Sequence, residues 1–140
     1  MSRVFWDTNL YIYMLEDYGS LSRRTIALRR AMLMRGDQLL TSTLTLGEVL
    51  VKPLETGNTE LHRAYEQALF TTTALLPFDE KAARIYPNLR RDRSLRIPDA
   101  IQLACAAAAG VDLFITNDQR LAAKQVRGIQ FVVSLDRAPI

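Results

Sequence analysis

Short apolar runs alternate with amphipathic segments along the chain, and the two kinds of segment predict strands and helices. The apolar runs are flanked by turn residues and have the length of buried strands. The predicted strands cover residues 4–6, 38–43, 71–76, 112–116 and 129–133. Between them, apolar residues recur at helical spacing. The predicted helices cover residues 10–15, 20 or 22 to 35, 44 to between 53 and 57, 59–70, 79–85, 98–109 and 117–124.

The order of these elements predicts the fold class. Strands that are nearly wholly apolar and alternate with helices are typical of a parallel sheet that is covered on both faces. We therefore expect residues 1–140 to form one α/β domain with about five parallel strands between two layers of helices. Ligands of such sheets bind beyond the carboxyl ends of the strands, near the point where the strand order reverses.

Four acidic residues are placed where this binding edge is expected. Asp7 directly follows the first strand, and Asp118 follows the fourth. Asp99 lies in the first turn of a predicted helix, and Glu48 lies on an apolar helix in surroundings suited to burial. Each has an ordinary alternative, because Asp7 and Asp118 could cap helices, Asp99 could interact with a helix dipole, and Glu48 could face solvent or pair with an arginine.

Taken together, the four acids favour a metal site. Clustered carboxylates repel one another unless a cation lies between them. Oxygen ligands with no nearby histidine or cysteine suit Mg²⁺ or Mn²⁺ better than zinc. We therefore expect a magnesium or manganese site at the carboxyl edge of the sheet.

The composition indicates in which cellular compartment the protein is expected. The 140 residues include a single cysteine, Cys105, so an intrachain disulfide is impossible. The first residues lack the apolar core of a signal peptide, and no segment approaches the roughly 18 apolar residues of a membrane span. These features predict a cytoplasmic protein with no membrane partner.

The charges favour a polyanionic partner. The net charge is +3, and 15 of the 18 basic residues are arginine, whose planar fork suits phosphate. The alternative is a genome whose base composition replaces lysine with arginine. A basic stretch precedes Asp99 and could bind substrate phosphate, or it could be a solvated loop. Its arginines are Arg90, Arg91, Arg93 and Arg96.

Four segments of the chain resemble the signature segments of PIN domains, most closely those of VapC-type toxins. The segments are Phe5-Trp6-Asp7-Thr8-Asn9, Thr43-Leu44-Thr45-Leu46-Gly47-Glu48-Val49, Pro98-Asp99-Ala100-Ile101 and Ile115-Thr116-Asn117-Asp118. They occur in the family's order and span almost the whole chain. The resemblance implies an α/β/α sandwich and a catalytic, metal-binding quartet formed by Asp7, Glu48, Asp99 and Asp118.

The same resemblance implies further roles for neighbouring residues. Thr8, Asn9 and Thr116 would orient the ligands or bind metal-bound water. Many relatives carry another acid two positions after the fourth one, where this chain has Arg120. That departure puts a second metal ion in doubt, and Arg120 could instead contact substrate phosphate.

The resulting hypothesis is a metal-dependent endoribonuclease. It would hydrolyse RNA to 5′-phosphate and 3′-hydroxyl ends, and the toxin resemblance implies a small antitoxin partner and a homodimer. Two alternatives remain: a non-catalytic PIN-like module whose acidic pocket accepts a partner's arginine, and a phosphatase with Asp7 as its nucleophile. The phosphatase is disfavoured because Asn9 stands where that chemistry commonly needs a second aspartate.

Overall fold

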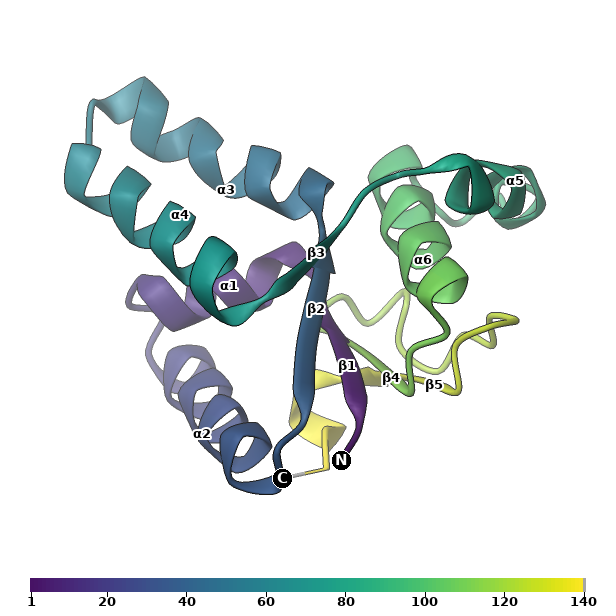
Figure 1. The fold of residues 1–140 in the computed structure, drawn as a ribbon, viewed down its shortest axis with the longest axis horizontal. Coiled ribbons are helices and arrows are strands. Elements are labelled where there is room, and N and C mark those ends of the chain that lie inside the picture. Colours follow the sequence, from purple (N-terminus) through teal and green to yellow (C-terminus); the bar gives the residue numbers. More distant parts are fainter. Residues whose placement is uncertain (140) are drawn as a thin grey trace.

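Five parallel strands lie between two layers of helices in the computed structural model, which describes residues 1–139 (Figure 1). The strands are β1 Arg3–Trp6, β2 Gln38–Ser42, β3 Ala74–Leu76, β4 Leu113–Thr116 and β5 Phe131–Ser134. The helices are α1 Thr8–Leu15, α2 Ser20–Arg35, α3 Thr43–Thr56, α4 Thr59–Thr72, α5 Glu80–Leu89 and α6 Ile97–Ala109, and a 3₁₀ turn follows over Leu135–Arg137.

The sheet has the strand order β3-β2-β1-β4-β5, and every pair of neighbours is parallel. The chain runs from β1 outward through β2 to β3, and α5 and α6 then carry it across to β4 on the other side of β1. The strand order therefore reverses between β1 and β4, which is where ligands bind in open α/β sheets. The predicted parallel sheet of five strands is confirmed.

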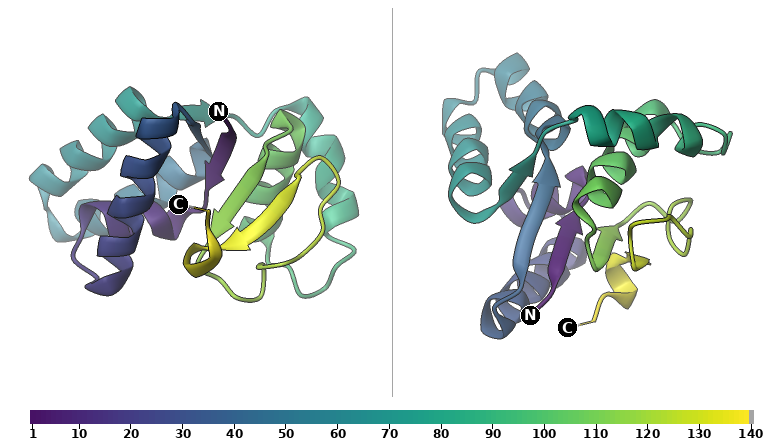
Figure 2. Two further views of the ribbon diagram at one scale, coloured as in Figure 1. Left: turned by 90° about the horizontal axis from the view of Figure 1, so that it is seen from below. Right: turned by 45° about the vertical axis from the view of Figure 1, so that its right-hand side comes forward.

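Alternating side chains of β1 supply the two hydrophobic cores. Val4 and Trp6 pack with residues of α1, α2, α3 and α4, whereas Phe5 packs on the opposite face with residues of α5 and α6. Phe5 stacks on Phe114 of β4 with ring centroids 5.0 Å apart. Trp6 meets Tyr11 edge to face at 5.4 Å. Because successive strand residues point to opposite faces, the short β1 anchors both helical layers seen in Figure 2.

Several boundaries differ from the sequence-based prediction: α5 continues to Leu89 beyond the predicted end at residue 85, and β5 begins at Phe131 and not at residue 129. Two further stretches, residues 117–124 and residues 71–73, differ in the type of structure they form. Residues 117–124 form turns and not a helix. The amides of Leu121 and Ala122 both donate to the carbonyl of Asp118, and Ala123 then adopts a left-handed φ of 68° and donates to Val132 of β5. The chain therefore leaves the helical path after a single turn.

The start of β3 was also predicted wrongly. Helix α4 continues to Thr72, so the strand begins only at Ala74. The hydroxyls of Thr71 and Thr72 donate to the carbonyls of Gln67 and Ala68, one turn earlier. This bonding allows β-branched residues to continue a helix, so their strand preference did not decide the local structure.

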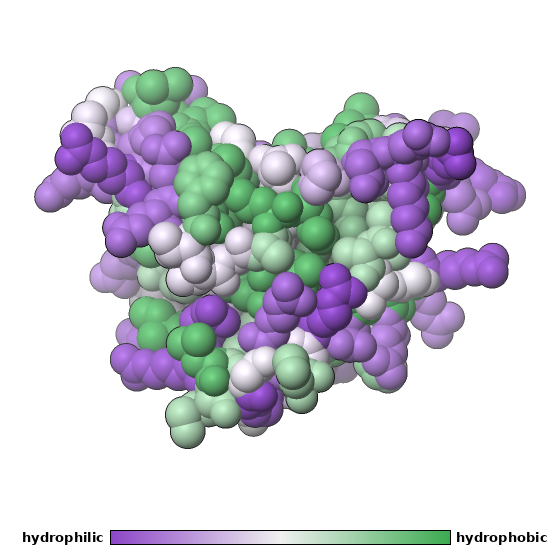
Figure 3. Space-filling model, in the orientation of Figure 1, coloured by the Kyte–Doolittle hydropathy of each residue, from purple (hydrophilic) through white to green (hydrophobic). Residues whose placement is uncertain are grey.

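The surface carries apolar side chains as well as charges. Figure 3 shows an apolar region in the middle of one face, with hydrophilic residues at its margins. Val51 and Leu54 of α3 and Phe70 of α4 are among the large apolar side chains that are exposed. Among residues 1–139, no helix combines the length and apolar character needed to cross a membrane.

Candidate metal and phosphate site

The candidate site lies at the carboxyl ends of β1 and β4, where the strand order reverses. Trp6 is paired with Ile115, and the amide of Asp7 donates to the carbonyl of Ile115 at 3.0 Å. This bond extends the strand pairing by one residue, so Asp7 and Thr116 leave the sheet side by side. A cleft of about 220 Å³ opens here. It is lined by Asp7, Thr8, Asn9, Glu48, Arg96, Pro98, Asp99, Gln102 and Asp118.

The structure brings all four predicted acids to this cleft. They come from four separate places in the chain: the ends of β1 and β4, the second turn of α3 and the first turn of α6. Asn9 also lines the cleft. Thr116 is not part of the lining, but its hydroxyl donates a hydrogen bond to Asp7, which is. Of the five arginines proposed to bind substrate, only Arg96 lines it.

Both carboxylate oxygens of Asp7 accept hydrogen bonds from uncharged groups. Its Oδ1 accepts the amide of Thr8 at 2.9 Å, and its Oδ2 accepts the hydroxyl of Thr116 at 2.8 Å. Burial nevertheless raises its pKa to about 6, and the negative charges of Asp99 and Glu48 add to the rise. The Asp7 carboxyl therefore lacks a compensating positive charge.

Glu48 is held by a network of uncharged side chains. The hydroxyl of Thr8 donates to its Oε1 at 2.6 Å, and Gln102 donates its amide to Thr8 at 3.1 Å and to Thr45 at 2.8 Å. Ser42 completes the network by donating to the Gln102 carbonyl oxygen. Glu48 itself is exposed, contrary to the burial that its apolar neighbours suggested.

Gln102, Thr45 and Ser42 were not predicted as site residues. Gln102 is 2% exposed and lies on α6 three residues after Asp99, so both side chains fall on one face of the helix. A polar residue at that spacing within an otherwise apolar helix was the available signal. Thr45 lies three residues before Glu48 on α3, on the same face of that helix, and gave a similar signal.

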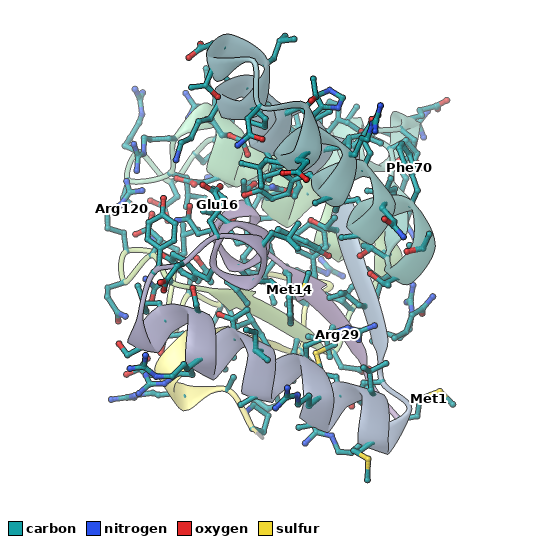
Figure 4. The ribbon with its side chains drawn as sticks, turned by 90° about the vertical axis from the view of Figure 1, so that its left-hand side faces the viewer. Met1, Met14, Glu16, Arg29, Phe70 and Arg120 are labelled. Atoms are coloured by element: carbon teal, nitrogen blue, oxygen red, sulfur yellow. The ribbon has the colours of Figure 1, made fainter. Side chains whose placement is uncertain are left out.

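Asp118 differs from the other acids because a cation of the chain already holds it. Arg120 donates from Nε to Oδ1 at 3.1 Å, from its backbone amide to Oδ1 at 2.9 Å, and from Nη2 to Oδ2. These hydrogen bonds hold the pKa of Asp118 below its usual value. The Arg120 side chain remains 42% exposed and lies at the edge of the molecule in Figure 4.

Asp99 is held more loosely. Its Oδ2 accepts the backbone amide of Arg96 at 3.2 Å, which ties the acid to the first turn of α6. The side chains of Arg96 and Arg120 approach the same oxygen at 3.8 and 3.5 Å. Asp99 therefore has positive charge nearby but lacks the close two-point contact that Asp118 receives.

The other basic residues before α6 lie away from the cleft. The Arg90 side chain donates to the carbonyl of Leu95 at 2.7 Å, a contact within the loop between α5 and α6. Arg91 contacts Asn88 at 3.5 Å. Arg93 is exposed. The basic stretch thus reaches the acids only through Arg96, its last residue.

A larger cavity exists, but its chemistry is different. An open pocket of about 670 Å³ lies between α5, α6 and residues 124–128. Its lining is mostly apolar, and its one acid, Asp92, is paired with Lys124 at 2.8 Å. The smaller cleft is therefore the better candidate for metal or phosphate chemistry.

The donor set of the cleft fits a hard divalent cation. Carboxylate and hydroxyl oxygens line it, and the uncompensated charge around Asp7 favours a cation. Across residues 1–139, however, no three acidic, histidine or cysteine side chains stand close enough together to form a finished metal site.

Comparisons with known proteins identify the family of the chain and relatives of its fold. The family model of the PIN domain matches residues 4–126. No curated protein matches the chain. Several solved structures resemble the fold, and the three described next are each below 25% identity.

The first of them is VapBC2 from Rickettsia felis bound to a DNA fragment from its promoter. It has 14% identity and a TM-score of 0.74, with 94% of this chain and 98% of the other covered. DNA-bound VapBC from Salmonella typhimurium has 18% identity and a TM-score of 0.71, with 96% and 99% covered. A toxin-antitoxin complex from Klebsiella pneumoniae has 23% identity and a TM-score of 0.66, with 90% and 94% covered.

Proposed function

Because the chain belongs to the PIN domain family, we propose that it is a metal-dependent endoribonuclease and the toxin of a toxin-antitoxin pair. One observation carries this proposal: Asp7, Glu48 and Asp99 line a single cleft at the point where the strand order reverses. Parallel sheets bind ligands there, and oxygen donors of this kind suit Mg²⁺ or Mn²⁺. Residues 1–140 would act as one domain.

In this proposal Asp7, Glu48 and Asp99 hold the ion. A bound divalent cation lowers the pKa of a water molecule and offsets the negative charge of a phosphodiester. The protein's own part is to orient the oxygens. Thr116 and the amide of Thr8 fix both oxygens of Asp7, while the Thr8 hydroxyl steadies Glu48.

Positive charge beside the acids would position the RNA. The Arg96 side chain is 70% exposed and lines the cleft, so its guanidinium can reach a backbone phosphate from solvent. Asn9 is exposed at the same cleft and offers a further polar contact.

The products of RNA cleavage test the chemistry. Attack by water leaves 5′-phosphate and 3′-hydroxyl ends, whereas attack by the ribose 2′-hydroxyl leaves a 2′,3′-cyclic phosphate. We expect the purified protein to give the first pair of ends with Mg²⁺ or Mn²⁺ and to lose activity in a chelator. Cyclic phosphate ends would overturn the mechanism. Absence of both cleavage and Mn²⁺ binding would favour a module that binds a partner's arginine.

The proposed partner is a small antitoxin that covers the cleft. The Klebsiella neighbour is a toxin-antitoxin complex, and exposed apolar side chains such as Leu54 and Phe70 give this chain surface for a partner. Toxicity on expression, relieved by a chain encoded beside this one, would support the pair. We also propose a homodimer that works in the cytoplasm. Light scattering of the isolated chain tests its mass, and a monomer at all concentrations would contradict the dimer.

A further inference from the structure

Arg120 holds Asp118 by a planar two-point contact. Its Nε and Nη2 donate to different oxygens of the carboxylate, and its backbone amide adds a third bond to Oδ1. Arginine forks of this kind give the strongest and most directional carboxylate contacts. Both oxygens of Asp118 are therefore occupied by one residue of the same chain.

The remaining acids of the cleft are held differently. Asp7 accepts bonds from an amide and a threonine hydroxyl, and Glu48 accepts one from a threonine hydroxyl. Arg120 reaches Asp99 only at 3.5 Å, through the same Nη2 that binds Asp118. Asp7 and Glu48 thus accept hydrogen bonds only from uncharged groups, Asp99 has two arginines at 3.5 and 3.8 Å, and Asp118 alone has a guanidinium on both of its oxygens.

We infer that Arg120 is a positioning residue that withdraws Asp118 from metal binding and leaves a site for a single divalent cation on Asp7, Glu48 and Asp99. The inference rests on the proposed function. A carboxylate whose two oxygens already bind a guanidinium offers no free oxygen in that direction to a metal ion. The positive charge of Arg120 also repels a second ion at that end of the cleft.

Metal titration separates this arrangement from the alternatives without using activity. Mn²⁺ binding is measured by calorimetry, and the number of bound ions is counted by paramagnetic resonance. The chains compared are the wild type, Arg120→Gln, and Arg120→Gln combined with Asp118→Asn. Arg96→Gln is the matched control, because it removes an arginine that approaches the same acids only at 3.8 and 3.9 Å.

We expect one Mn²⁺ per wild-type chain. Arg120→Gln should bind Mn²⁺ at least about tenfold more tightly, because a charge-assisted contact of ordinary strength no longer competes for Asp118. The added Asp118→Asn change should remove this gain, and Arg96→Gln should change the affinity by less than about threefold. Arg120→Lys keeps a charge but loses the fork, so it should fall between the wild type and Arg120→Gln.

Three results would overturn the inference: two ions in the wild type, equal affinities for the wild type and Arg120→Gln, or a gain that persists when Asp118 is asparagine. A protein whose Mn²⁺ binding depends on Asp7, but not on Arg120, would refute this inference alone. A protein that binds no Mn²⁺ in any form would refute both the inference and the proposed metal-dependent function. A rise in melting temperature with Mn²⁺, larger in Arg120→Gln than in the wild type, gives a second readout on folded protein.

Discussion

Replacing Asp7 by asparagine should make the metal-free protein more stable at neutral pH. The folded protein raises the pKa of this carboxyl from 3.8 to about 6, chiefly through burial. Each tenfold change in an acid dissociation constant corresponds to about 1.4 kcal/mol, so ionised Asp7 lowers the free energy of unfolding by up to about 3 kcal/mol. This is a large part of the roughly 5–15 kcal/mol that stabilises a typical domain.

The sign of this effect depends on pH. Below pH 3.8 the carboxyl is protonated in both the folded and the unfolded chain, and its burial carries no charge penalty. Between 3.8 and about 6 the unfolded chain loses the proton first, so the wild type loses stability as the pH rises. The advantage of Asp7→Asn should therefore be near zero at about pH 3, roughly 0.5 kcal/mol at about pH 4, and reach its plateau above pH 6.

Urea unfolding at several pH values measures the difference. Glu55→Gln is the control, because it removes one negative charge from the exposed surface of α3 and should change stability by less than about 0.5 kcal/mol. Mg²⁺ should stabilise the wild type and leave Asp7→Asn unchanged. The reasoning would be refuted if Asp7→Asn were no more stable than the wild type at pH 7.5. It would also be refuted if the advantage of Asp7→Asn over the wild type were as large at pH 4 as at pH 7.5.

Three further substitutions test the supports of the site and the fold. Gln102→Leu should lower RNA cleavage by about 10–100-fold through loss of the network that holds Glu48, and unchanged kcat would contradict that role. Phe5→Ala should cost about 3–5 kcal/mol in urea unfolding, because the buried ring stacks on Phe114, and a loss below about 1 kcal/mol would be inconsistent with this packing. Gly128→Ala should lower the melting temperature, since φ is +97° and the new Cβ would lie 2.8 Å from the Ala107 carbonyl, and an unchanged value would argue against that close approach.

Alternation of strands and helices was enough to predict the sheet. Residues such as Val4, Phe5 and Trp6 are apolar on both faces of a strand, which is the pattern of a parallel sheet buried on both sides. The same reasoning failed where local bonds decided the structure. Threonine hydroxyls extended α4 past Thr71, and the left-handed Ala123 ended the turn after Asp118.

The positions of the acids were predictable because parallel strands share an edge. Asp7 and Asp118 follow neighbouring strands, so topology alone brings them to one end of the sheet. The state of each carboxylate was not predictable in this way. Whether Arg120 points to phosphate or to Asp118 depends on a turn conformation, and residues 117–124 were expected to be helical.

The polar network behind the site was missed for a related reason. Gln102 and Thr45 meet only after α3 and α6 pack against the same sheet. Helical spacing indicated on which face of its helix each residue lies. The sequence did not indicate that these two helix faces meet.

The most direct test is the rate at which labelled RNA is cleaved by the wild type and by Asp7→Asn at saturating Mg²⁺, with Glu55→Gln as the charge-matched control. We predict that Asp7→Asn, although more stable, loses at least about 100-fold in rate, since it removes a proposed metal ligand outright. Glu55→Gln should match the wild type. Equal rates for Asp7→Asn and the wild type would contradict the assignment of this cleft as the active site.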